Sequence, residues 1–212
     1  MVAFKLVAFD LDGVLVDGLG SWIEVHKALG TYEYSKNHGN EFYSGKITFD
    51  EWARRDVELW KGVEIERIRE ILYRVKLMNG AKETINKLKE TGCKTAIISG
   101  GLQILADRVK KELDIDYAFA NKIICNNGRV CGINQIVDFN GKGNILKMIA
   151  ERNGIDTKKC AAVGDYINDI PLFKTAGFSI AFNPKDNEIL KFANVVIFEK
   201  DLTKILPFLH GD

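Results

Sequence analysis

Short apolar runs, each bounded by polar or glycine residues, recur along the chain. Each run has the length of a buried parallel strand, which is covered on both faces and is therefore apolar throughout. The runs span residues Lys5 to Phe9, Thr95 to Ile98, Ala161 to Val163, Phe178 to Phe182 and Val195 to Phe198.

Helical patterns separate these runs, and most of them are followed by glycine, which is favoured just past the end of a helix. Parallel strands need helical crossovers, so the alternation of strand and helix over residues 79–212 predicts an α/β fold. We expect a doubly wound parallel sheet with helices on both faces. The helical patterns span Ala81 to Thr91, Leu102 to Leu113, Lys142 to Asn153 and Asp169 to Ala176.

The segment from Val16 to Met78 breaks this alternation. It carries tryptophan and phenylalanine at helical spacings and no convincing strand, so we predict a helical insertion that packs as a cap. The predicted domains are a catalytic core of residues 1–15 and 79–212 and a cap of residues 16–78. Within the core, Asn121 to Val137 favours a hairpin with its turn at Asn127-Gly128.

Composition and charge indicate a globular protein and limit the kinds of partner that we expect. A chain of 212 residues with 46% hydrophobic residues is long enough to bury a core. The net charge of +1 favours neither nucleic acid nor an anionic membrane as a partner. The apolar run Met1 to Phe9 carries Lys5 and lacks a small-residue cleavage site, so it predicts a strand and not a signal peptide. No other stretch approaches membrane-spanning length.

The cysteines do not indicate a metal site, because Cys93, Cys125, Cys131 and Cys160 lack the spacing of zinc ligands. Cys125 and Cys131 flank the predicted hairpin turn, and we expect them to be reduced thiols. A cytoplasmic protein is the corresponding expectation.

Polar residues at the carboxyl ends of the predicted strands are the candidates for chemistry, because doubly wound sheets bind ligands there. Asp10 and Asp12 follow the first strand and share one side of an extended segment. Their mutual repulsion requires a cation or a proton. One carboxylate can attack while the other transfers a proton. A turn or cap would explain one of these aspartates as a structural residue.

Two further positions offer phosphate-binding groups. Ser99 and Gly100 follow a strand and precede a helix, where a hydroxyl and free N–H groups form a phosphate cradle. A serine there is alternatively a helix N-cap. Lys142 begins a helix, where its positive charge is unfavourable next to the positive end of the helix dipole. This position therefore suggests a functional role for Lys142. A solvated surface lysine is the structural alternative.

Another strand end carries Asp165, Asn168 and Asp169. Oxygen ligands from Asp165 facing Asp10 suit Mg²⁺, which prefers carboxylates, retained waters and phosphate. Helix capping by Asn168 or Asp169 is the structural alternative. Separate structural explanations would have to hold at all of these positions, so we favour a functional site.

These residues resemble, in order and spacing, the motifs of haloacid dehalogenase superfamily phosphatases: Asp10-Leu11-Asp12-Gly13-Val14, Ser99-Gly100, Lys142 and Gly164-Asp165 through Asp169. The resemblance implies an aspartyl-phosphate nucleophile at Asp10 and an acid/base at Asp12. It implies Mg²⁺ ligation by Asp10, Asp165 and the backbone carbonyl of Asp12. Ser99, Gly100, Lys142 and Asn168 resemble the phosphate binders, and Asp169 an anchor behind them.

The chain is most similar to the phosphoserine phosphatase branch, through residues 116–121 and the stretch around Ala181-Phe182. In that branch a glutamate after the first motif binds the substrate's amino group, and an arginine in the cap binds its carboxylate. Here the glutamate position falls near Leu19 or Gly20 and the arginine position falls on Asp56. Arg54 or Arg55 for the carboxylate, and Asp17 or Asp56 for the ammonium, are the expected substitutes.

The resemblance therefore implies a magnesium-dependent hydrolase of a small phosphorylated metabolite, with phosphoserine as the named candidate substrate. The same chemistry on another small phosphate ester is one alternative. A receiver-like signalling module that accepts phosphate on aspartate is another, and the Asp10/Asp12 pair argues against it because it favours turnover. The substrate and the oligomeric state stay open from the sequence.

Overall fold

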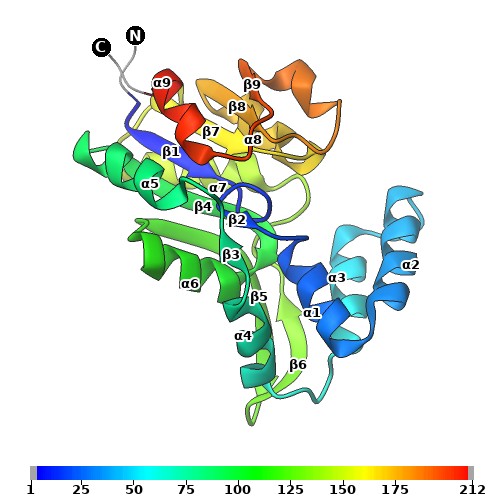
Figure 1. Ribbon diagram of the computed structural model, residues 1–212. Helices are drawn as coiled ribbons and strands as arrows, with labels where there is room; N and C mark the ends of the chain where they lie inside the picture. Colours follow the sequence, from blue (N-terminus) through cyan, green and yellow to red (C-terminus); the bar gives the residue numbers. More distant parts are fainter. Residues whose placement is uncertain (1–3, 210–212) are drawn as a thin grey trace.

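A seven-stranded sheet forms the centre of the computed structural model, which describes residues 4–209 (Figure 1). The strand order is β6-β5-β4-β1-β7-β8-β9, and neighbouring strands are parallel except for β5 and β6. This confirms the predicted α/β fold. The strands are β1 (Leu6–Phe9), β4 (Lys94–Leu102), β5 (Tyr117–Asn126), β6 (Arg129–Asn134), β7 (Cys160–Gly164), β8 (Phe178–Phe182) and β9 (Val195–Ile197).

Two parts of the sequence predictions fall outside the described residues. Residues 1–3 of the apolar run that begins at Met1 are among them, and so are residues 210–212 of the predicted core.

Helices cover both faces of the sheet. The alternation of side chains along β1 shows why: Val7 and Phe9 pack into one hydrophobic core, and Leu6 and Ala8 pack into the other. The first core includes residues of α5 (Ala81–Glu90), α6 (Gln103–Leu113) and α9 (Leu206–Leu209), and the second includes residues of α7 (Lys142–Arg152) and α8 (Ile170–Thr175). Short 3₁₀ turns complete the core at η1 (Thr157–Lys159), η2 (Ile167–Asp169), η3 (Ile189–Phe192) and η4 (Leu202–Ile205).

The segment between β1 and α5 forms the insertion (residues 16–78), which contains α1 (Ser21–Leu29), α2 (Tyr32–Tyr43), α3 (Phe49–Glu58) and α4 (Ile65–Tyr73). Helices α1 to α3 project beyond the sheet, whereas α4 packs along α6 (Figure 1). The prediction that this segment contains no strand was wrong. Strands β2 (Val16–Asp17) and β3 (Lys76–Leu77) pair antiparallel and join the two ends of the insertion. Two residues are too few to show a period-2 pattern.

Local boundaries differ from the sequence predictions near the glycines of β4. The stretch Ser99-Gly100-Gly101 was expected to be a turn, but β4 continues to Leu102 with an irregular register after Ile98. The hairpin of β5 and β6 is confirmed, with positive φ at Asn127 (49°) and Gly128 (75°) in its turn. Positive φ at two successive residues is what the tightest hairpin turns require, and Asn-Gly supplies it.

The four cysteines are free thiols in the structure. Burial raises the pKa of Cys93 to about 12 and that of Cys160 to about 11. These two thiols therefore behave as small apolar side chains. Separately, no helix among residues 4–209 combines the length and the apolar character needed to cross a bilayer.

Asn121 on β5 connects the end of β4 to the loop that precedes α7. Its side chain is fully buried. The amide nitrogen donates to the carbonyls of Gly100 (2.9 Å) and Val137 (3.2 Å), and the amide oxygen accepts from the backbone N–H of Ile136 (2.8 Å) and Val137 (2.9 Å). One side chain thus pairs backbone groups that the sheet leaves without partners.

We predict that Asn121→Ala lowers the free energy of unfolding by about 2–4 kcal/mol, because it leaves buried backbone N–H and carbonyl groups unpaired. Urea unfolding measures this change. Asn134→Ala, at an exposed position of β6, is the matched control and should change stability by less than about 0.5 kcal/mol. Equal losses in the two variants would contradict the role given to Asn121.

Candidate active site

The fold brings the predicted motifs to one edge of the sheet. Asp10 follows β1, which lies between β4 and β7, so the carboxyl ends of these three strands are adjacent. Ser99 lies near the end of β4, and Asp165 directly follows β7. These three side chains are buried, as are those of Lys142 and Asp169. The sequence prediction that the strand ends form one site agrees with this arrangement.

Lys142 is fully buried at the start of α7. Its Nζ lies 2.7 Å from Oδ1 of Asp10 and 2.6 Å from Oδ1 of Asp169. Burial alone would lower the pKa of this lysine, but the two carboxylates outweigh burial and raise it above its usual value. The reading of Lys142 as a solvated surface lysine is therefore wrong, and the candidate nucleophile has a permanent cation beside it.

Asp169 holds the turn after β7 in place. Its Oδ2 accepts hydrogen bonds from the backbone N–H of Asp165 (2.9 Å) and Tyr166 (3.2 Å), while its Oδ1 contacts Lys142. A Cβ on Gly164 would lie 2.4 Å from the Asp169 carboxyl carbon, so only glycine leaves room there. Asp169 therefore positions both the cation and Asp165, which agrees with the predicted anchoring role.

Ser21 at the start of α1 holds the carboxylate of Asp12. The backbone N–H of Ser21 donates to Oδ1 of Asp12 and the hydroxyl donates to Oδ2, both at 2.9 Å. The same hydroxyl accepts from the N–H of Leu102 (3.0 Å). Gly101 leaves space for this arrangement, because a Cβ there would lie 2.4 Å from Oδ2 of Asp12. The pKa of Asp12 is raised to about 6, mainly by burial and secondly by the negative charge of Asp10.

Ser21 was not predicted from the sequence. The feature that could have identified it is its position at the start of a helix shortly after the Asp12 motif.

Three carboxylates, those of Asp10, Asp165 and Asp169, each place an oxygen within 4.8 Å of the others. The pKa of Asp165 is raised to about 8, mainly by burial and secondly by the negative charge of Asp10. This concentration of negative charge calls for a cation, and a set of hard oxygen donors suits Mg²⁺. Both oxygens of Asp169 already accept hydrogen bonds, from Lys142 and from two backbone N–H groups. The oxygens of Asp10 and Asp165, with the Asp12 carbonyl, are therefore the donors that fit the ion.

Lys185, in the loop after β8, contacts the same donors. Its Nζ lies 2.7 Å from Oδ2 of Asp165 and 3.5 Å from the backbone oxygen of Asp12. Gly13 permits this approach, because its φ of +96° suits glycine and a Cβ would lie 2.1 Å from Oδ2 of Asp165. No motif in the sequence pointed to Lys185, since it belongs to a loop outside the predicted strand-end motifs.

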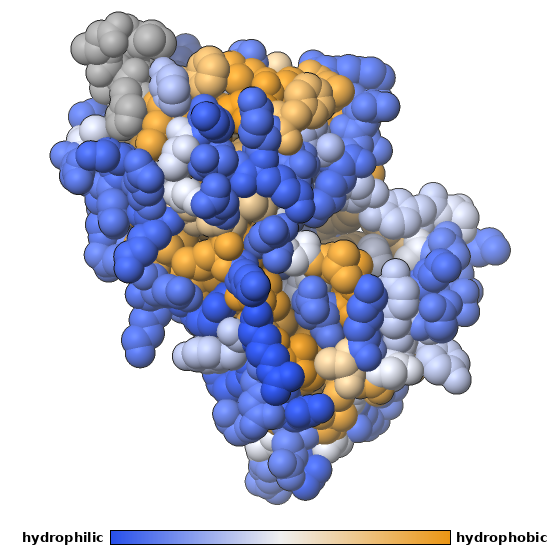
Figure 2. Space-filling view, viewed as in Figure 1, coloured by the Kyte–Doolittle hydropathy of each residue, from blue (hydrophilic) through white to orange (hydrophobic). Residues whose placement is uncertain are grey.

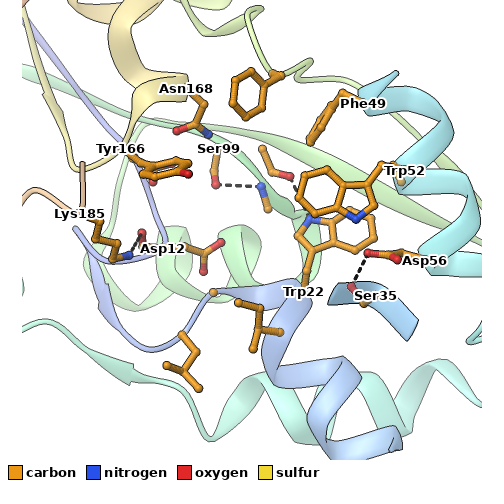
Figure 3. A pocket seen from close by; sticks show the side chains of 18 of the residues that line it. Asp12, Trp22, Ser35, Phe49, Trp52, Asp56, Ser99, Tyr166, Asn168 and Lys185 are labelled. Carbon is orange, nitrogen blue, oxygen red and sulfur yellow. Dashed lines mark hydrogen bonds between the residues drawn. The ribbon is translucent and has the colours of Figure 1, made fainter. Parts of the chain in front are cut away.

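A cavity of about 300 Å³ lies between these strand ends and the insertion, and it is large enough for a small ligand. Figure 2 shows the surface hollowed where the helices of the insertion face the lobe that carries α8 and β8. In Figure 3, Asp12, Ser99, Asn168 and Lys185 lie at one end, and Trp22, Phe49, Trp52, Ser35 and Asp56 lie at the other. The two ends are called below the phosphate end and the far end.

At the phosphate end, three of the four predicted phosphate binders line the cavity, whereas Lys142 is not among the lining residues. Ser99 is 1% exposed and its hydroxyl accepts from the N–H of Gly101 (3.0 Å). Gly100 lines the wall beside it, and Asn168 carries a buried Oδ1 with no partner among the described residues. These groups lie at the same end of the cavity as Asp10 and Asp12, as predicted.

The predicted substrate-binding residues of the insertion do not all reach the cavity. Asp56 lines it and is 2% exposed. Asp17 instead pairs with Lys200 (3.0 Å). Arg54 and Arg55 lie outside the cavity on the exposed face of α3, where their guanidinium groups pair with Asp50 (Arg54) and with Glu41 and Glu51 (Arg55). The structure therefore does not bring either arginine to the cavity.

A network of polar side chains surrounds the buried carboxylate of Asp56, and it was not predicted from the sequence. Oδ2 accepts from the Ser35 hydroxyl (2.8 Å) and lies 3.2 Å from Nε2 of His26, while Oδ1 lies 2.7 Å from Nδ1 of His38. Burial opposes ionisation, but the two imidazoles and the hydroxyl outweigh it and hold the pKa of Asp56 below its usual range. The two histidines come from α1 and α2, whose rotation relative to α3 is not encoded in any short motif.

Comparison with known proteins agrees with this geometry. The family model of haloacid dehalogenase-like hydrolases matches residues 4–177. The chain is 38% identical to phosphoserine phosphatase of Methanocaldococcus jannaschii, over 97% of each chain. It is 39% identical to phosphoserine phosphatase of Archaeoglobus fulgidus over 88% of its own length, but spans only 54% of that protein.

A solved phosphoserine phosphatase, captured as an analogue of its phospho-aspartyl intermediate, superimposes with a TM-score of 0.88. The two chains are 36% identical, and the match covers 98% of this chain and 100% of the other. These findings favour a hydrolase over the receiver-like module. The chain therefore belongs to the haloacid dehalogenase-like hydrolases, and it is a phosphoric monoester hydrolase similar to the phosphoserine phosphatases.

Proposed function

We propose that this protein hydrolyses small phosphomonoesters in a magnesium-dependent reaction that passes through an aspartyl phosphate on Asp10. The observation that carries the proposal is the contact of 2.7 Å between Asp10 and the buried ammonium of Lys142, at the end of a cavity that Asp12 also lines. Phosphoryl transfer depends mainly on positioning and on neutralising the charge of the phosphate oxygens. The phosphate end of the cavity supplies both.

In the first step, a carboxylate oxygen of Asp10 attacks phosphorus and the bond from phosphorus to the ester oxygen breaks. Asp12 transfers its proton to the leaving oxygen, which departs as an alcohol. Ser21 orients Asp12 through two hydrogen bonds, so the carboxyl group is held in one position. Lys142 interacts with Oδ1 of Asp10 throughout and limits the rotation of the nucleophile.

In the second step, Asp12 is a carboxylate and accepts a proton from water. The water oxygen attacks phosphorus, the bond from phosphorus to Asp10 breaks, and inorganic phosphate leaves. The carboxylate of Asp10 and the protonated form of Asp12 are thereby restored. Ser99, Gly100 and Asn168 line the end of the cavity that holds the phosphoryl group in both steps.

Asp10, Asp165 and the carbonyl of Asp12 are the groups that would hold Mg²⁺. When bound, the ion neutralises charge on the phosphate oxygens. Lys185 contacts Asp165 and the carbonyl of Asp12, so its ammonium lies beside the groups that would hold the ion.

The insertion acts as a cap over this site, because α1 and α3 supply Trp22, Phe49, Trp52 and Asp56 to the cavity. Phosphoserine is the first compound to assay, since the named relatives are phosphoserine phosphatases. A small phosphorylated metabolite fits a cavity of about 300 Å³. A cytoplasmic location is part of the same proposal.

Asp10→Asn should abolish the release of inorganic phosphate from phosphomonoesters, because an amide oxygen cannot form the aspartyl phosphate. We expect a loss of at least about 10³-fold in kcat, and a similar loss in excess chelator that magnesium reverses. Thermal unfolding of the variant provides the control for folding. Substantial activity in a cleanly purified Asp10→Asn protein would exclude Asp10 as the nucleophile.

Asp12→Asn should slow alkyl phosphates far more than aryl phosphates, because only the poor alkoxide leaving group needs a proton. The expected loss is about 10²–10⁴-fold for alkyl esters in the first step. Burst kinetics with p-nitrophenyl phosphate separate that step from hydrolysis of the phosphoenzyme. Equal losses on both classes of ester would argue against Asp12 as the acid.

Ser21→Ala should lower kcat for alkyl phosphates by about tenfold with little change in KM, because Asp12 loses one of its two hydrogen bonds from this residue. Ser21→Thr keeps the hydroxyl and should restore part of the rate. If Ser21→Ala lowers the rates on alkyl and aryl phosphates equally, Ser21 has only a structural role.

A further inference from the structure

Among the described residues, no lysine or arginine side chain lines the far end of the cavity. Among the described residues that line the cavity, Lys185 is the one basic side chain, and it contacts Asp165 at the phosphate end. Arg54 and Arg55 pair with carboxylates outside the cavity. A substrate carboxylate placed at the far end would therefore lose its water without gaining a cationic partner, which is costly.

The charged group at the far end is the carboxylate of Asp56. Nε2 of His26 lies 3.2 Å from one of its oxygens and Nδ1 of His38 lies 2.7 Å from the other, and neither histidine is among the residues that line the cavity. Nδ1 of His26 in turn contacts the indole Nε1 of Trp60 (3.1 Å) and the hydroxyl of Thr31 (2.7 Å). Asp56 is therefore the charged member of this network that lines the cavity.

Aromatic side chains form the walls between Asp56 and the phosphate end (Figure 3). The indole of Trp22 is fixed by a hydrogen bond from Nε1 to the carbonyl of Gly100 (3.0 Å) and packs on Trp60 with ring centroids 5.3 Å apart. Phe49 packs edge-on against Trp52 (5.9 Å) and against Phe139 (5.8 Å). Aromatic faces attract cations, and this attraction strengthens in a site from which water is excluded.

We propose that the far end of the cavity is a cation subsite, so that the preferred substrates are phosphomonoesters that carry an ammonium or quaternary ammonium group and no carboxylate. This inference rests on the proposed phosphatase function and specifies its substrate class. Phosphoserine carries an ammonium that suits the subsite and a carboxylate that finds no cationic partner there. Its carboxylate should therefore weaken its use as a substrate.

Pairs of esters that differ in one charge test the subsite on the wild-type protein. Phosphocholine and 3,3-dimethylbutyl phosphate have the same shape, and phosphoethanolamine and ethyl phosphate differ by an ammonium. We expect kcat/KM for at least one cation to exceed that of its neutral partner by about tenfold or more, and phosphoethanolamine to exceed phosphoserine. The proposal is overturned if neither cationic ester has a higher kcat/KM than its neutral partner. It is also overturned if kcat/KM is higher for phosphoserine than for phosphoethanolamine.

Asp56→Asn tests the carboxylate directly. It should reduce the ratio of kcat/KM between the cationic ester and its neutral partner by about tenfold, because it removes the anion and keeps the shape of the side chain. Asp50→Asn, on the exposed face of the same helix, is the matched control and should keep the ratio. An unchanged ratio in folded Asp56→Asn overturns the proposal. If thermal unfolding shows that this variant does not fold, the wild-type comparison decides.

Binding separates the subsite from the chemistry. Calorimetry on the Asp10→Asn protein with Mg²⁺ compares the dissociation constants of phosphocholine and 3,3-dimethylbutyl phosphate without turnover. If the wild-type protein releases phosphate from no ester, including p-nitrophenyl phosphate, the proposed function fails. Tighter binding of the cation would then still support the subsite, and equal binding would overturn it.

Discussion

The active site depends on one buried cation, the ammonium of Lys142 between Asp10 and Asp169. Burying a charge costs free energy unless it is paired, and here two carboxylates contact it at 2.7 and 2.6 Å. The contact also fixes the positions of three elements, because the residues belong to the end of β1, the start of α7 and the turn before α8. Close packing of α7 on α8 makes it possible, since a Cβ on Gly143 would lie 2.6 Å from the carbonyl oxygen of Pro171. Loss of Lys142 would leave two buried carboxylates without their cation.

The fold and the phosphate end were predictable because they follow from local rules. Strands such as β1 are buried on both faces and therefore appear as continuous apolar runs, and the carboxyl ends of parallel strands share one edge. Asp10, Ser99 and Asp165 had to converge for that reason. Ser21 and Lys185 did not follow from the same rule, because one lies at the start of an inserted helix and the other in a loop after β8. Their contacts with Asp12 and Asp165 exist only in the folded chain.

The acidic residue at the far end of the cavity could be predicted from the sequence, but the directions in which the neighbouring side chains point could not. The acidic residue at Asp56 was evident from the sequence, yet the neighbouring arginines were expected to compensate for it. A shift of one residue turns a side chain by about 100° around a helix. Arg54 and Arg55 therefore face solvent and the acidic residues of α2 and α3, while Asp56 faces inward toward His26, His38 and Ser35. The orientation of α3 was set by packing between helices, which no short motif encodes.

Phe139 links the two ends of the cavity through side-chain packing. This residue lies in the loop just before Lys142, and its ring contacts Phe42 on α2 (5.0 Å) and Phe49 on α3 (5.8 Å). The wall that faces the far end of the substrate is thus continuous with the loop that leads to the catalytic lysine. A substrate group at the far end would contact Phe49 and would therefore act on the same aromatic cluster that packs against this loop. Selectivity at the far end would then act on the rate of phosphoryl transfer as well as on binding.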